Sequence, residues 1–489
     1  MSTTLTVADP VPAQDLTRRA AVHILNRLGY GPRPGDVDRV LSMGLDRYIA
    51  RQLDPGPDSA LDARLEAFPY LGWTMAETYS RYLEDQQNRG TNYIATLNNQ
   101  QRSAQVVRAV HAQNQLHEVM TWFWMNHFSV NLPDDYVRYS AHDYEKALRT
   151  HALGRFKDLL SASAHHPAMM SYLDNYLSTV SKFDRSGRLT SGLNENYGRE
   201  LLELHTLGVD AGYSQNHVYN AATVLTGWGL NRAQGAFVFT AANHDSQATE
   251  IFGLNIPAGQ MQESGEKLLD YLAQHPKTAE FIATKLVRHF VSDDPPAALV
   301  QKVADTFLKT GGDVREMLRV IVASKEFWDQ AFGPGKYRDP FQYVASTLRA
   351  VDADVQDARA LAAVLNNMGQ PQYGCIPPTG WSDKGREWVN PSSHMYRMNF
   401  ALDLVSNVVG GNNAQPFTGI FVDIPKILSA NGVRVDDASA IAAFFNREIF
   451  GNALSAGTLG AAGTATNGTV TLGNRVVGLL LAGPEAQGR

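Results

Sequence analysis

The chain has 489 residues, of which 44% are hydrophobic and 19% are charged, and its formal net charge is −6 at pH 7. This composition is typical of a globular protein with ample apolar material for a core. The acidic balance and the lack of a long basic run argue against a nucleic-acid partner. The single cysteine, Cys375, excludes an intramolecular disulfide framework and a multi-cysteine metal site.

The N-terminus carries no recognisable targeting segment. Residues 1–14 contain no apolar stretch of signal-peptide length, and no run in the chain reaches the length that spans a bilayer. We therefore expect a soluble chain without a membrane span. It is expected to be cytoplasmic as the sequence stands, or exported if a leader was removed.

Most of the predicted elements are helices. Residues 15–28 predict an amphipathic helix that ends at the turn Gly29-Tyr30-Gly31-Pro32. Residues 74–130 contain almost no breaker, and their apolar spacing is helical. Helical spacing recurs as far as residues 396–409. These patterns predict an all-α fold with one large multi-helix domain over residues 15–451.

Two segments depart from the helical pattern. Ala236–Phe239 and Ile251–Gly253 are typical of strands, so we predict a small β-hairpin insertion near residues 236–253. Residues 452–473 are rich in glycine, alanine and threonine, which is typical of a flexible linker. A loosely attached C-terminal helix within residues 474–489 is expected to close the chain.

A predicted helix over Asn194–Gly208 carries the most suggestive polar residues. At about 100° per residue, Asn196, Glu200 and Glu203 fall on one stripe with Arg199 on its flank. Two carboxylates one turn apart suit acid–base chemistry or the binding of a cation. Arg199 is also spaced i,i+4 from Glu203, and such pairs stabilise any solvated helix face. A structural role for the stripe therefore stays open.

Other segments supply further candidate groups. His127 lies on the apolar side of its helix, where a hydrogen-bonded core histidine is the ordinary interpretation. His244 and Asp245 follow the β segment and are candidates for an imidazole and a carboxylate in a site. Tryptophans on loops can stack on sugars, and they also fill cores. The candidate substrate-binding residues are Asn196, Arg199, Trp228, Trp381 and Trp388.

Several common catalytic motifs are missing from the sequence. There is no Gly-x-Ser-x-Gly elbow and no P-loop. His117-Glu118 is followed by Thr121 where a zincin needs its second histidine. Ordinary serine hydrolases, NTPases and zincins are therefore not expected, and no specific motif implies a cofactor.

Short motifs spread along nearly the whole chain form a recognisable set. They are Leu25–Pro32, Asn126–Ser129, Pro167–Asn175, Asn194–Gly208, Leu225–Trp228, His244-Asp245, Pro378–Trp381 and the closing Leu-Ala-Gly-Pro-Glu. The set resembles the bacterial family catalogued as domain of unknown function 1800, whose activity is unassigned. Similar proteins are often exported and encoded beside a sulfatase-like partner. Relatives commonly carry Trp-His-Asn-His-Phe, whereas Met125 replaces its first histidine here, which breaks a His-x-His metal chelate. His205 tends to be aromatic in relatives, so we do not expect it to be catalytic.

Three interpretations of function remain open. In the first, Glu200 and Glu203, with His127, His244 and Asp245, catalyse hydrolysis or elimination on a polar polymer such as a polysaccharide. In the second, Glu200, Glu203, His127 and His244 bind a divalent metal that assists the reaction. In the third, the polar stripe is an ion-pair network of a non-catalytic protein that binds a glycan or another protein.

Overall fold

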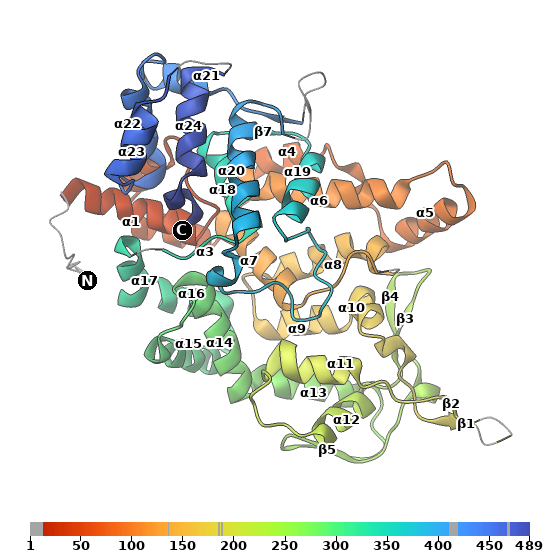
Figure 1. Cartoon of the computed structure of the whole chain (residues 1–489). Coiled ribbons are helices and arrows are strands. Elements are labelled where there is room, and N and C mark those ends of the chain that lie inside the picture. The colour runs from red at the N-terminus through yellow and green to blue at the C-terminus, as the bar shows by residue number, and fades with distance from the viewer. Residues whose placement is uncertain are drawn as a thin grey trace.

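The computed structural model describes residues 13–134, 136–183, 186, 189–333, 335–409, 419–466 and 470–489. Within these residues the chain forms a multi-helix body, and strands occur only as four two-stranded sheets (Figure 1). The prediction of an all-α fold with small hairpin elements is confirmed. None of the helices described is both long enough and apolar enough to cross a membrane.

The N-terminal half of the chain builds one side and the centre of the body. Its elements as far as the candidate helix are α1 (Ala13–Arg27), α2 (Asp36–Met43), α3 (Leu45–Leu53), α4 (Ser59–Leu65), η1 (Pro69–Gly72), α5 (Met75–Gln87), α6 (Tyr93–His111), α7 (Gln115–His127), α8 (Val137–His151), α9 (Phe156–Ala164), α10 (Pro167–Tyr172), η2 (Asn175–Leu177), β1 (Lys182–Phe183) and β2 (Leu189–Ser191). Helix α7 lies at the centre of the molecule (Figure 1).

The middle of the chain forms the end of the molecule that holds the candidate helix. Its elements are α11 (Asn196–Glu200), η3 (Leu201–Thr206), α12 (Gln215–Val224), β3 (Trp228–Asn231), β4 (Ala236–Phe239), η4 (Ala241–Asn243), β5 (Thr249–Ile251), β6 (Leu254–Ile256), α13 (Gln262–Gln274), α14 (Pro276–Phe290), α15 (Ala297–Thr310), α16 (Val314–Val322), α17 (Lys325–Asp329) and η5 (Gln330–Phe332).

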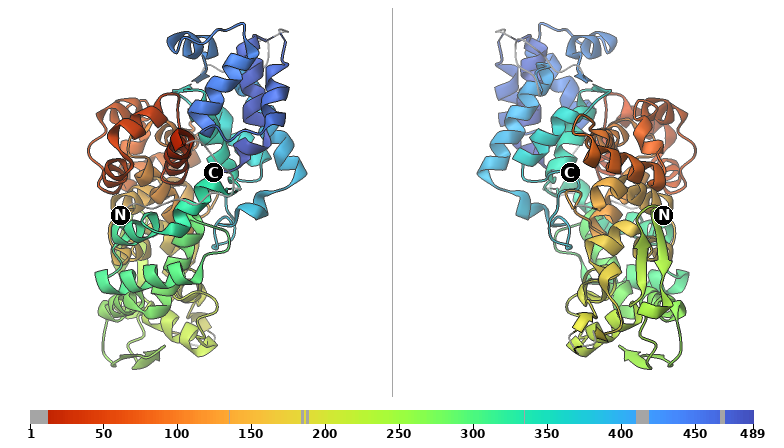
Figure 2. Two further views of the ribbon diagram at one scale, coloured as in Figure 1. Left: turned by 90° about the vertical axis from the view of Figure 1, so that its left-hand side faces the viewer. Right: turned by 90° about the vertical axis from the view of Figure 1, so that its right-hand side faces the viewer.

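The last part of the chain forms the opposite end. Its elements are α18 (Pro340–Ala350), β7 (Asp354–Val355), α19 (Arg359–Asn367), η6 (Gly385–Trp388), α20 (Pro391–Val405), β8 (Ile420–Phe421), α21 (Ile424–Ala430), α22 (Ala438–Phe450), α23 (Ala456–Gly463), α24 (Leu472–Ala482) and η7 (Pro484–Gln487). The side views show an elongated molecule whose C-terminus lies near its middle rather than at either end (Figure 2).

Local sequence signals explain where several helices begin. Thr74, Ser214 and Asp339 each form a capping box at the start of α5, α12 and α18. In this arrangement the cap side chain accepts a bond from the third helical N–H, and the third side chain bonds back to the cap. These caps satisfy N–H groups that have no partner within the helix.

The core runs through the whole body and is centred on α7. This helix buries apolar side chains around most of its circumference, including Leu116, Met120, Phe123 and Trp124. A helix that is apolar on nearly all sides must be enclosed by other elements. The Trp124 indole N–H, which would otherwise lack a partner there, donates to the carbonyl oxygen of Ala152 at 2.9 Å.

The β segment differs from the predicted single hairpin. Ala236–Phe239 pairs with Trp228–Asn231 as an antiparallel hairpin, and Thr249–Ile251 pairs with Leu254–Ile256 as a second one. Phe252 and Gly253 have positive φ at the turn of the second hairpin. The prediction missed the first strand because Trp228 lies directly after a helix and a glycine turn.

The C-terminal segment also differs from its prediction. Residues 456–463 of the expected linker form α23, and the closing helix α24 already begins at Leu472. Val476, Val477 and Leu480 of α24 are fully or almost fully buried in the core. The helix is therefore an integral part of the body, and residues 467–469 of the predicted linker lie outside the described residues.

Candidate functional site

The helix that carries the candidate carboxylates changes its geometry between them. An α-helical segment, α11, runs to Glu200 and continues as the π-helical turn η3 over Leu201–Thr206. The N–H of Leu207 donates to the carbonyl oxygen of Leu202 at 2.9 Å, which is the i to i+5 pattern of a π-helix. Single π-turns inside α-helices occur frequently at functional sites. The sequence predicted one regular helix.

Close packing positions this helix against α12. A Cβ atom on Gly198 would lie only 2.6 Å from the backbone nitrogen of Ala222. A side chain at this position would push the two helices apart, so glycine allows the backbones to touch. The helix then ends at Gly208, whose φ of +88° is in the left-handed region that favours glycine.

The two glutamates lie side by side in different environments. Arg199 contacts Glu203 at 3.5 Å and Glu195 at 3.2 Å, so the predicted i,i+4 pairs are formed. Burial and the neighbouring Glu203 carboxylate raise the pKa of Tyr213. Burial, together with the charge of Glu203, raises the pKa of Glu200, although Arg199 opposes this effect. None of the described residues forms a hydrogen bond to the Glu200 carboxyl group.

His127 lies in the core rather than in an open site. Its side chain is 2% exposed, and its Nε2 atom is 3.1 Å from the carbonyl oxygen of His205. Burial, with the charges of Lys285 and His205, lowers the pKa of His127 well below its usual value. His127 thus contacts the helix that carries Glu200 and Glu203. It contacts the buried side of that helix, whereas the two glutamates occupy half-buried positions. Its observed surroundings are those of a core histidine.

His244 and Asp245 are held by a local hydrogen-bond network. The two ring nitrogens of His244 lie 2.8 Å and 3.1 Å from the carbonyl oxygens of Thr226 and Gln260. The N–H of Asp245 donates to the Thr226 hydroxyl at 2.8 Å, and its carboxylate accepts from the N–H of Gln247 at 3.1 Å. These contacts join the turn after α12 to the following loop, and none of them reaches the two glutamates.

The candidate substrate contacts divide into buried and accessible residues. Trp228 is 0% exposed and packs against His165 and Phe237, so it belongs to the core. Trp388 is also buried, and its indole N–H donates to the carbonyl oxygen of Ser382 at 3.1 Å. Trp381 is partly buried, and Asn196 and Arg199 are exposed and half-buried, respectively.

Asn126 is a residue that the sequence analysis passed over. Its side-chain oxygen accepts from the N–H of Trp381 at 2.6 Å, and its side-chain nitrogen donates to the carbonyl oxygen of Trp381 at 2.9 Å. This pair of bonds ties the Pro378–Trp381 loop to α7. The sequence did offer one signal for this contact, because Asn126–Ser129 and Pro378–Trp381 both belong to the set of short motifs that resembles the family.

The proposed metal ligands do not meet. The described residues contain no cluster of three or more histidine, cysteine, aspartate or glutamate side chains that could hold a metal ion. The predicted set of Glu200, Glu203, His127 and His244 is therefore not assembled in this structure. The physical reason is that His127 is buried in the core while Glu200 and Glu203 occupy half-buried positions, and the contacts of His244 are to Thr226 and Gln260 instead.

Comparisons with known proteins place the chain in a family without defining its chemistry. The family model described as Protein of unknown function (DUF1800) matches residues 23–488. No curated protein and no solved structure matches the chain significantly.

Proposed function

The chain belongs to the family described as Protein of unknown function (DUF1800), and we propose that it is a hydrolase or lyase acting on a polar polymer such as a polysaccharide. In this proposal the Glu200 carboxyl group donates a proton to the leaving oxygen. Glu203, which is paired with Arg199, removes a proton from water in hydrolysis or from the sugar ring in elimination. The roles of His127 and His244 are structural.

The observation that carries this proposal is the contrast between the two carboxyl groups. The pKa of Glu200 is raised by burial and by Glu203, whereas Glu203 is paired with Arg199 at 3.5 Å. Two neighbouring carboxyl groups in different electrostatic environments are the usual arrangement of an acid and a base. The π-turn that begins directly after Glu200 supports the same assignment.

The Pro378–Trp381 loop is the proposed substrate contact. The charge of Glu200 acts on Tyr172, whose hydroxyl donates to the carbonyl oxygen of Ile376 at 2.6 Å. Tyr172 therefore links the residues just before the loop to the surroundings of the candidate acid. An indole on this loop offers a flat apolar face against which a sugar ring can stack.

The test compares Glu200→Gln and Glu203→Gln with the parent on a panel of neutral, acidic and sulfated polysaccharides. Reducing-end release reports hydrolysis, and ultraviolet absorbance of unsaturated products reports elimination. We expect both substitutions to abolish cleavage. Thermal stability should be unchanged or higher for Glu200→Gln, because a carboxyl group whose pKa is raised by folding lowers stability above its ordinary pKa. The Arg199–Glu203 pair is partly exposed and contributes at most about 1 kcal/mol.

Glu195→Gln is the matched control, because Glu195 contacts the same Arg199 at 3.2 Å without entering the proposed reaction. It should retain activity. Cleavage that survives in both active-site variants would contradict the proposal. A parent that binds the polymer without cleaving it would instead favour the non-catalytic alternative. The sulfatase-like partner expected from the family resemblance stays a prediction, which co-purification tests.

A further inference from the structure

A pocket of about 320 Å³ lies between α1, the segment before α18 and the C-terminal residues. It is lined by Arg19, His23, Asn26, Arg338, Glu485 and Arg489, among others. The walls are fixed by backbone contacts, since Tyr337 and Gly488 form a β-bridge and Arg338 donates to the carbonyl oxygen of Ala486 at 2.5 Å. The pocket is therefore built where the two ends of the described chain meet.

Among the described residues, buried polar atoms without partners occur in the wall of this pocket, at His23 and Arg489, and at Arg27 on the adjoining turn of α1. His23 is 5% exposed and its Nε2 atom has no hydrogen-bond partner among the described residues, and the same holds for the Nε atom of Arg489, which is 7% exposed. Arg27, next to the lining residue Asn26, is 0% exposed, and none of its three guanidinium nitrogens has a partner in the described structure. Unpaired buried guanidinium groups are costly.

The local charge balance is positive. The carboxylate of Asp293 is held by Lys336 at 2.6 Å, and that of Asp383 by Lys285 at 3.3 Å. Neither lysine binds the two remaining carboxylates, since Asp339 caps α18 and Glu485 accepts from the N–H of Ser455 at 3.1 Å and from the Thr458 hydroxyl at 2.9 Å. These four carboxylates face five cationic side chains, those of Arg27, Arg338, Arg489, Lys285 and Lys336. Burial and the charges of Arg489 and Arg338 lower the pKa of Arg27 well below its usual value, with Asp293 opposing them.

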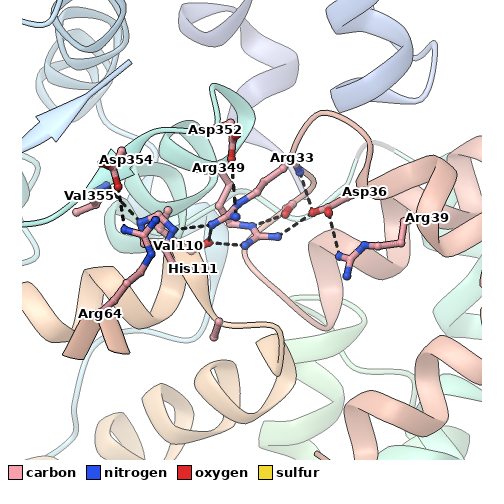
Figure 3. Close-up of polar contacts among 12 residues, drawn as sticks. Arg33, Asp36, Arg39, Arg64, Val110, His111, Arg349, Asp352, Asp354 and Val355 are labelled. Atoms are coloured by element: carbon pink, nitrogen blue, oxygen red, sulfur yellow. Dashed lines mark hydrogen bonds and ion pairs between the residues drawn. The ribbon is translucent and has the colours of Figure 1, made fainter. Parts of the chain in front are cut away.

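Another buried arginine shows how this fold normally satisfies such a group. The Nε atom of Arg349 donates to the carbonyl oxygen of Gly31 at 2.6 Å, one terminal nitrogen donates to that of Val110 at 2.6 Å, and the other donates to Asp36 at 3.0 Å. Figure 3 shows this network, in which Asp36 lies between the guanidinium groups of Arg349 and Arg39. Arg27 has no equivalent set of acceptors.

We propose that this pocket binds a small molecule through an oxyanion group, a carboxylate, sulfate or phosphate. His23 and Arg489 of the lining receive the group, and the buried charge of Arg27 behind them is neutralised by it. A guanidinium group stays charged in proteins, so it cannot relieve its burial by losing a proton. Water can accept its hydrogen bonds but does not neutralise its charge, whereas an oxyanion does both through bidentate bonds. The volume lies at the lower end of that of ordinary ligand pockets.

Titration calorimetry and thermal unfolding of the full chain test this proposal in a low-salt chloride buffer. The probes are inorganic phosphate, sulfate, acetate and glycerol 3-phosphate, added separately. We expect saturable heat and a saturable rise in melting temperature with at least one probe, because a ligand that binds the folded state stabilises it. Tighter binding of the ester than of inorganic phosphate would identify the anion as part of a larger molecule.

The key variant is Arg27→Met, which removes the buried charge and keeps a side chain of similar length. Its melting temperature without anion should equal or exceed that of the parent, and its affinity for the anion should fall at least tenfold. Arg434→Met is the control, since Arg434 is exposed and paired with Asp436, and it should bind as the parent does. If Arg27→Met does not fold, Arg489→Met provides the same comparison.

The proposal is wrong if no probe binds saturably, or if the Arg27 and Arg489 variants bind as tightly as the parent. The outcome is independent of the proposed catalysis. Glu200→Gln should bind the anion normally, so the loss of cleavage and the loss of anion binding are separable.

Discussion

Replacing Glu118 with glutamine should remove a large, pH-dependent part of the folding free energy. Glu118 lies on α7 and is 7% exposed. One terminal nitrogen of Arg149 contacts its two carboxylate oxygens at 2.8 Å and 2.7 Å. Burial opposes ionisation of Glu118, but the charge of Arg149, the contact with His117 at 3.7 Å and the charge of Arg108 overcome it and lower the pKa of Glu118 from 4.5 to about 2.

This pKa difference sets the expected magnitude. A shift from 4.5 to about 2 corresponds to about 3 kcal/mol of folding free energy at neutral pH. Because the pKa in the folded state is depressed, this stability is fully present above pH 4.5. It is lost as the pH falls toward about 2, where the carboxylate becomes protonated in the folded state as well.

Urea unfolding of the parent and of Glu118→Gln between pH 7 and pH 2 measures this effect. The variant should be about 3 kcal/mol less stable at pH 7, and the two free-energy curves should converge between pH 4.5 and about 2. Glu316→Gln is the control, because Glu316 forms an exposed pair with Arg319 at 3.2 Å, and its curve should stay within about 0.5 kcal/mol of the parent. Parallel curves for Glu118→Gln and the parent through the acid range would refute the reasoning.

Three further predictions concern the candidate site. Gly198→Ala should destabilise the protein by about 1–3 kcal/mol in urea unfolding, because its Cβ would lie 2.6 Å from the nitrogen of Ala222; an unchanged midpoint would contradict this close approach. Trp228→Ala should cost about 3–5 kcal/mol because it empties a fully buried site, whereas Trp381→Ala should mainly weaken polymer binding in an affinity assay. His127→Gln should cost about 1 kcal/mol through the lost bond to the carbonyl of His205, and it should leave the pH profile of any cleavage unchanged; a shifted profile would restore His127 to the reaction.

The helical architecture was predictable because its causes are local. Neighbouring residues alone determine helix caps such as Thr74 and Asp339. They also determine the apolar spacing of α7. The hairpin prediction failed in its pairing, since which strand joins Ala236–Phe239 depends on how the preceding glycine turn folds back. The linker prediction failed because glycine- and alanine-rich residues can also pack closely, as α23 does beside α22 and α24.

The candidate site was predictable only in its residue types. The pairing of Arg199 with Glu203 followed from i,i+4 spacing, but the π-turn after Glu200 and the burial of Trp228 did not. The spacing of residues on a helix predicts which of them share a face. It does not predict how far that face is exposed to solvent.

By itself, the sequence determined the helical class, the family and the neighbouring positions of the two glutamates, since each depends on residues close together in the chain. Tertiary structure alone decided that His127 and His244 are tied to carbonyls, and that Arg27 lies buried beside a pocket formed with the last residues of the chain. The pKa of a group and the availability of its hydrogen bonds depend on charges, burial and acceptors that come from distant segments. These quantities exist only once the chain has folded.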